Sequence, residues 1–148
     1  MVAALVILAV IVAVAALLNP SREDFRWFLQ LHRPRWLTFE RWIPAIWLVI
    51  YLCFYVSALL VWQATASLAL MGGYLVLVVL VQSYTLVICR SRSLRNGTLI
   101  GLAGWAWGMA LGVVVVSQMR PAAVLLIPFL LWSPVGSFVT WRMERLNR

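Results

Sequence analysis

The sequence has no lysine and very little acid: of 148 residues, four are Asp or Glu, one is His and two are Cys. Only 11% of the residues are charged and 65% are hydrophobic, whereas soluble domains are about 25% charged. This composition excludes an ordinary soluble domain and is typical of a membrane protein. At this length we expect one domain, residues 1–148.

The scarcity of titratable groups also excludes several functions. Cys53 and Cys89 fall inside apolar stretches, where they act as small hydrophobic residues, and two cysteines with one histidine form no metal-ligand pattern. No acid lies in any apolar stretch, which disfavours ion pumps and proton-coupled transporters. No nucleophile–base pair is apparent, so we expect neither an enzyme nor a metal site.

Five stretches contain no charged residue, and we interpret them as membrane spans. A span needs roughly 20 apolar residues, and backbone groups in lipid favour helices. The sequence therefore predicts an all-α integral membrane protein, a bundle of five transmembrane helices. The first stretch is slightly short, but no basic residues precede it as in a signal peptide, so we expect it to be retained. The predicted spans are 2–18, 43–62, 68–89, 98–116 and 121–141.

All twelve basic residues are arginines, and their distribution predicts an orientation. With alternating spans, residues 19–42, 90–97 and 142–148 share one side and hold eleven arginines, and the other side holds only Arg120. The positive-inside tendency then places the amino terminus outside and the first loop and carboxyl terminus in the cytoplasm, in a plasma or other energy-transducing inner membrane. Because the arginines flank spans and form no separate basic domain, we expect no nucleic-acid binding.

Five glycines, one just before the fourth predicted span and four within it, recur at helical spacing. Their separations of four, three, four and four residues place them on one helix face, where small residues let two helices approach closely. This face either packs inside the monomer or forms a homodimer contact. The residues are Gly97, Gly101, Gly104, Gly108 and Gly112.

Aromatic residues and one amide stand out within the spans. Trp47, Tyr51 and Phe54 share a helix face at i, i+4 and i+7, a pattern that suits either a packed core or the wall of a ligand site. Gln82 is the strongest polar candidate, for an interhelical hydrogen bond or a ligand contact.

Several motifs around the first loop and the last span occur in a fixed order. They are Trp27-x3-Leu31, Arg33-Pro34-x-Trp36, Pro44-x2-Trp47-x3-Tyr51 and Trp62, then Pro128-Phe129-Leu130-Leu131-Trp132 and Arg145-Leu146-Asn147. In these motifs the chain resembles the TspO/translocator family, also called tryptophan-rich sensory proteins.

The resemblance implies a five-helix bundle, often dimeric, with a pocket between the helices under the first loop. Members bind tetrapyrroles and, in some cases, sterols or synthetic aromatic ligands. Residues 19–42 would then form a lid loop carrying Trp36. The ligand-binding residues implied by the resemblance and the aromatic stripe are Trp36, Trp47, Tyr51, Phe54, Gln82, Phe129, Trp132 and Gly136.

The chain also departs from the family pattern. Thr38 and Phe39 stand where the family usually has two prolines, and Leu86 stands where a third-span asparagine recurs. The aromatic walls are thus retained while polar contacts of the third span are lost.

Two functions from different classes remain open. The first is binding of a tetrapyrrole (porphyrin, haem or chlorophyll type) or a similar aromatic ligand, for sensing, trafficking or disposal. Indole faces would hold the ring, and Arg33, Arg35 and Arg41 at the rim would pair with its carboxylates, although arginines there also suit lipid headgroups. The second is a structural accessory subunit of a larger membrane complex, with a degenerate pocket that is occupied by lipid or pigment. We expect no obligatory cofactor, and partners limited to the bilayer, such a ligand, and a homodimer or larger complex.

Overall fold

The computed structural model describes residues 1–148 and is entirely helical, without strands. This agrees with the predicted class. The elements in chain order are α1 (Val2–Leu17), α2 (Arg22–Leu29), the 3-10 helix η1 (Glu40–Trp42), α3 (Ile43–Thr65), α4 (Leu68–Ser91), α5 (Leu94–Gln118), α6 (Arg120–Val124) and α7 (Ile127–Leu146).

The two-residue connections between α3 and α4 and between α4 and α5 use the same local chemistry. Ala66 ends α3 and Arg92 ends α4 in the left-handed conformation, with φ of 46° and 48°. In each case the next residue is a serine, Ser67 or Ser93, whose hydroxyl accepts the backbone N–H three residues on and so caps the following helix. The chain therefore reverses within two residues, which makes α3, α4 and α5 antiparallel neighbours.

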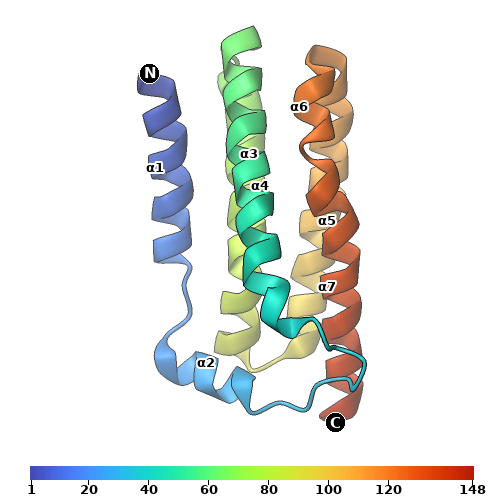
Figure 1. Ribbon diagram of the computed structural model, residues 1–148. Coiled ribbons are helices and arrows are strands. Elements are labelled where there is room, and N and C mark those ends of the chain that lie inside the picture. The colour runs from blue at the N-terminus through green and yellow to red at the C-terminus, as the bar shows by residue number, and fades with distance from the viewer.

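The long helices lie side by side, with the two termini at opposite ends of the bundle (Figure 1). Four helical segments are long and apolar enough to cross a membrane: Glu40–Thr65, Leu68–Ser91, Leu94–Gln118 and Arg120–Leu146. The 16-residue α1 reaches that length only together with α2, to which it is bent by 73°. The structure thus has four spans, or five if the bent pair counts as one.

The arginines separate along the bundle axis as the sequence predicts. The lid loop, the α4–α5 connection and the end of α7 gather at one end of the bundle, and α6 begins with Arg120 at the other (Figure 1). Which of these ends faces the cytoplasm stays a prediction.

The lid loop, residues 19–42, is more regular than expected because it contains α2. Ser21 caps this helix by accepting the N–H of Asp24. The apolar side of α2 carries Trp27 and Phe28, which pack against a small cluster of Ile88, Leu94 and Met143 at the ends of α4, α5 and α7. An amphipathic helix thus lies across the arginine-rich end of the bundle (Figure 1).

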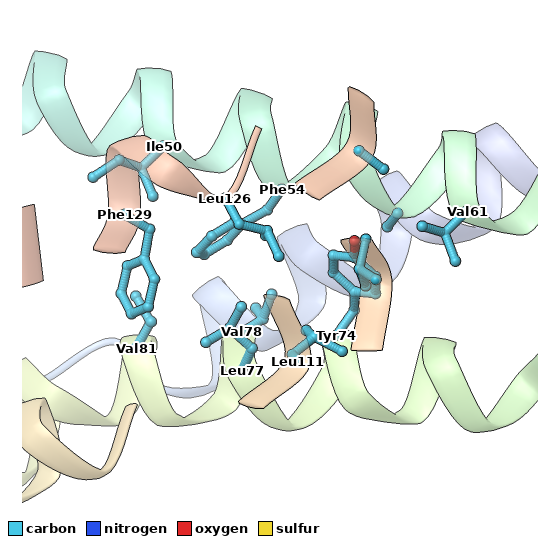
Figure 2. Close-up of a cluster of buried hydrophobic side chains, with 13 residues drawn as sticks. Ile50, Phe54, Val61, Tyr74, Leu77, Val78, Val81, Leu111, Leu126 and Phe129 are labelled. Carbon is cyan, nitrogen blue, oxygen red and sulfur yellow. The ribbon is translucent and has the colours of Figure 1, made fainter. Parts of the chain in front are cut away.

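The main hydrophobic core fills the half of the bundle away from the lid loop. Side chains of α3, α4, α5 and the α6–α7 segment meet there, and Figure 2 shows Phe54, Leu126 and Phe129 between the facing helices. The core runs from Ile50 and Val81 towards Val61. The other half of the bundle, next to the lid loop, holds a cavity.

The glycine stripe of α5 faces α4 and α7 of the same chain. A Cβ added at Gly108 would lie 2.6 Å from Cε1 of the buried Phe129, and one added at Gly97 would overlap Ile88. The remaining glycines meet Ser137 and Tyr84 (Gly101), Leu80 (Gly104), and Leu126 and Leu130 (Gly112). The stripe therefore packs within the chain, as the intramolecular interpretation predicts, and formation of a homodimer stays a prediction.

Candidate ligand-binding cavity

A cavity of about 410 Å³ lies between α3, α4, α5 and α7, directly above the lid loop. Its volume falls in the range of about 300–1,000 Å³ that small-molecule sites occupy. Sixteen of its 27 lining residues are hydrophobic, so it suits a largely apolar occupant. No three His, Cys, Asp or Glu side chains lie together in the chain, and the chemistry available is that of aromatic, hydroxyl and amide groups.

Aromatic rings from two helices line the cavity. Trp47 and Tyr51 of α3 contribute two rings with centroids 6.1 Å apart, and Phe129 and Trp132 of α7 contribute two more. Pro44 lies in the first turn of α3, where a missing N–H costs nothing, so this helix begins just below Trp47. The i, i+4 spacing then brings Trp47 and Tyr51 to the same face.

Uncharged polar groups line the inner part of the cavity. The side chains of Gln82 and Thr85 in α4 line it and make no hydrogen bond to the protein. The hydroxyls of Tyr84 and Thr140 lie next to each other, and both lie within reach of the carbonyl of Gly136, at 3.3 and 3.1 Å. One hydroxyl therefore donates to this carbonyl while the other donates to the first hydroxyl. Gln82 therefore does not link two helices and faces the cavity instead.

Ser137 adds an unusual polar group to the same wall. Its residue is 4% exposed and its hydroxyl has no hydrogen-bond partner. The hydroxyl lies against Gly101, in space that a Cβ at residue 101 would fill. A buried hydroxyl without a hydrogen-bond partner lowers the stability of the folded protein. This wall of the cavity is therefore not optimised for stability alone.

The mouth of the cavity is bounded by Arg33 and Glu40 of the lid loop. The two side chains form an ion pair, and Arg33 Nη1 also donates to the carbonyls of Leu29 and Leu31 at 3.2 and 2.9 Å. The guanidinium lies 5.5 Å from the ring centroid of Phe28. Arg33 therefore stabilises the conformation of the lid loop through contacts with several of its residues.

Four of the predicted site residues do not reach the cavity. Trp36 is 42% exposed and packs on Phe138, with centroids 5.9 Å apart, at the outer surface of α7. Phe54 is 1% exposed and lies in the core, edge-on to Phe129 at 5.3 Å. Arg35 and Arg41 do not line the cavity, and Arg41 lies over Trp42.

The reasons for these differences are local. Phe54 is on the face of Trp47 and Tyr51 but about one turn deeper, beyond the closed end of the cavity. Trp36 turns outward because the chain folds back within a few residues: the N–H groups of Leu37 and Thr38 bond to the carbonyls of Pro34 and Trp36. The next residue, Leu37, is buried and lines the cavity instead of Trp36.

Several lid-loop residues line the cavity although the sequence did not predict them as site residues. They are Phe25, Phe28, Leu29, Leu37, Phe39 and Glu40. The apolar side of a helix over residues 22–29 would have indicated Phe25 and Phe28. Phe39 stands at a position where the resemblance calls for proline, and its ring lies edge-on to Trp132 at 6.1 Å.

The sequence profile of the TspO/MBR family matches residues 2–146. The chain belongs to the TspO/MBR family. It is also similar to the uncharacterized membrane protein YtaB of Bacillus subtilis (strain 168), with 24% identity over 127 residues that cover 84% of this chain and 82% of that protein. Together with its apolar helices, the match makes this TspO/MBR family member a multi-pass integral membrane protein.

The resemblance seen in the sequence is thus confirmed for the whole chain. In this TspO/MBR protein the motif residues Trp47, Tyr51, Phe129, Trp132 and Gly136 all line one cavity.

Proposed function

We propose that this TspO/MBR protein binds a flat, largely apolar aromatic ligand of the porphyrin type in the cavity, for sensing, trafficking or disposal. The observation that carries the proposal is the group of aromatic rings from two helices. Trp47 and Tyr51 of α3 and Trp132 of α7 line the same cavity, and several aromatic rings around one cavity offer faces and edges on which a flat ring can pack.

The inner polar groups support a ligand with a few polar atoms on its ring. Gln82 and Thr85 offer an amide and a hydroxyl that have no protein partner. In an apolar environment such groups gain free energy when a ligand atom completes their hydrogen bonds. We propose binding without chemical conversion, because no nucleophile is paired with a base on the cavity wall.

Titration of the purified protein with protoporphyrin tests the proposal. The absorbance band of the porphyrin is the readout, because it does not depend on which tryptophans remain. Each well-placed aromatic contact contributes about 0.5–1.5 kcal/mol beyond area burial, so Trp47→Leu and Trp132→Leu should each weaken binding about 2- to 10-fold or more.

Trp62→Leu is the matched control. Trp62 lies on α3 like Trp47 but three residues before its far end and outside the cavity, so its loss should leave the affinity unchanged. Absence of binding of both protoporphyrin and its uncharged dimethyl ester, or binding that is equally indifferent to all three substitutions, rejects the proposal.

One observation favours the alternative of a structural accessory subunit. Phe39 of the lid loop already contacts Trp132, and Trp36 joins Phe138 and Trp141 in an aromatic cluster on the outer surface of α7. On the outer surface of a span, such a cluster offers a contact site to another membrane protein as well as to lipid. Purification from native membranes in mild detergent tests this. A defined partner that is lost with Phe138→Ser supports it, and recovery of only monomer or homodimer counts against it.

A further inference from the structure

We infer that Glu40 makes the cavity mouth select a ligand that is uncharged at its lid-loop end, such as an esterified or alkyl-substituted macrocycle, over a macrocyclic dicarboxylate. The inference rests on the proposed function and deepens it by naming the charge class of the ligand. It reverses the sequence-based prediction that arginines at the rim pair with ligand carboxylates.

The cavity lining has few charged side chains. Among its 27 residues, only Arg33 and Glu40 carry a charge at neutral pH, and they are joined in an ion pair. The lining is therefore neutral overall. A ligand carboxylate placed deeper would meet only amide, hydroxyl and apolar groups, where an unpaired charge is strongly disfavoured.

Arg33 is already engaged through three of its five N–H donors, which leaves only those of Nη2. Of its five N–H donors, Nε serves Glu40 and Nη1 serves the carbonyls of Leu29 and Leu31. Its side chain is 18% exposed, against 45% for Glu40. A ligand carboxylate would have to share this guanidinium with Glu40, at the cost of repulsion between two like charges, or displace Glu40 and leave it unpaired.

No second cation can replace Arg33 as the partner of a ligand carboxylate. The chain has no lysine. Arg41 lies over the ring of Trp42, and neither Arg35 nor any arginine other than Arg33 lines the cavity. The eleven arginines at this end of the bundle create a general attraction for anions, but at the mouth itself the one cation, Arg33, is neutralised by Glu40.

Protoporphyrin and its dimethyl ester form a matched pair of ligands that differ in charge and share the ring. We expect the wild-type protein to bind the diester about tenfold more tightly than the diacid. Glu40→Gln frees Arg33 and should raise the affinity for the diacid about tenfold, with less than a twofold change for the diester. The double substitution Arg33→Gln/Glu40→Gln should lose that gain.

Glu144→Gln is the matched control for long-range charge. Glu144 forms the other ion pair, with Arg148, at the same end of the bundle and outside the cavity, so its substitution should change neither affinity. A wild-type preference for the diacid, an equal gain in Glu144→Gln, or a gain that persists in the double variant would each overturn the inference.

The outcomes separate the inference from the proposed function. If neither porphyrin binds the wild type, the proposed function fails. If both bind and the diacid binds more tightly, the function stands and the inference fails. The wild-type comparison alone decides this second point, even if a variant does not fold.

Discussion

The side chain of Asn147 forms hydrogen bonds with the backbone of His32, which lies 115 residues earlier in the sequence. Its Oδ1 accepts the backbone N–H of His32 at 2.9 Å, and its Nδ2 donates to the carbonyls of His32 and Met143 at 3.0 and 2.8 Å. The end of α7 therefore fixes the lid loop at the residue before Arg33, beside the cavity mouth. This contact gives the asparagine of the terminal Arg145-Leu146-Asn147 motif a structural role.

Asn147→Ala removes this attachment. A net hydrogen bond contributes about 0.5–1.5 kcal/mol, with the low end for exposed groups, so we expect a loss of about 1–2 kcal/mol in the free energy of unfolding. A ligand in the cavity should also dissociate several-fold faster, because the lid loop opens more easily. Thermal unfolding and stopped-flow release of porphyrin measure the two effects.

Arg148→Ala is the control for Asn147→Ala. Arg148 is the next residue, and its side chain is 72% exposed in its i, i+4 pair with Glu144. Such surface pairs contribute little to stability, so neither quantity should change. Equal behaviour of the two variants would show that Asn147 does not hold the lid loop.

Gly108→Ala should destabilise the bundle. The added methyl group would lie 2.6 Å from Phe129, a buried residue whose ring also packs edge-on against Phe54 with centroids 5.3 Å apart. Overpacking of this kind costs about 1–3 kcal/mol. Gly72→Ala on α4 meets no atom within 4 Å and should stay within about 0.5 kcal/mol of the wild type. Denaturant titration of both variants in detergent compares them.

Gly136→Val should separate binding from stability. Gly136 lines the cavity, and a Cβ built there meets nothing within 4 Å. The larger side chain therefore enters open space and reduces the room for a ligand without disturbing helix packing. We expect at least a fivefold loss of porphyrin affinity with a melting temperature close to that of the wild type. Unchanged affinity would place the ligand away from α7.

The helices and the aromatic walls could be predicted because they follow from periodicity. Charge-free stretches give the spans, and i, i+4 spacing gives the face shared by Trp47 and Tyr51. Periodicity identifies a face but not its partner or its depth. For that reason the glycine stripe was compatible with both a monomer and a dimer contact, and Phe54 was assigned to the ligand wall although it lies in the core.

The lid loop could not be predicted in the same way. Its path depends on long-range bonds such as His32 to Asn147, and outside helices no period indicates where a side chain points. Trp36 therefore faces outward while Leu37 and Phe39 line the cavity. The pairing of Arg33 with Glu40, seven residues apart, likewise arises only when the loop folds back.

The predicted orientation can be tested by labelling single cysteines. With Cys53 and Cys89 replaced by Ala, Asn96→Cys and Gln118→Cys place one exposed thiol at each end of α5. If the arginine-rich end faces the cytoplasm, a membrane-impermeant maleimide added to intact cells should label residue 118 and not residue 96. Labelling of residue 96 alone would mean that the topology is inverted.

Ser57 connects three helices at a break in the helical hydrogen bonding. At the junction of α6 and α7, the N–H of Leu126 bonds to the carbonyl of Ala123, three residues earlier, rather than to that of Ala122, four residues earlier. The freed carbonyl of Ala122 accepts from the hydroxyl of the fully buried Ser57 at 2.8 Å, and Tyr74 lies 2.5 Å from the same hydroxyl. One serine thus satisfies polar groups from α4 and α6.

Ser57→Ala should therefore cost more than Tyr74→Phe. The serine substitution leaves two buried polar groups without partners, each costing about 1–3 kcal/mol, and we expect a loss of about 2–4 kcal/mol in the free energy of unfolding. Tyr74→Phe leaves the Ser57–Ala122 bond in place and should cost about 1 kcal/mol. Denaturant titration in the same detergent compares the two variants, and an equal or larger loss for Tyr74→Phe would mean that the carbonyl of Ala122 does not depend on Ser57.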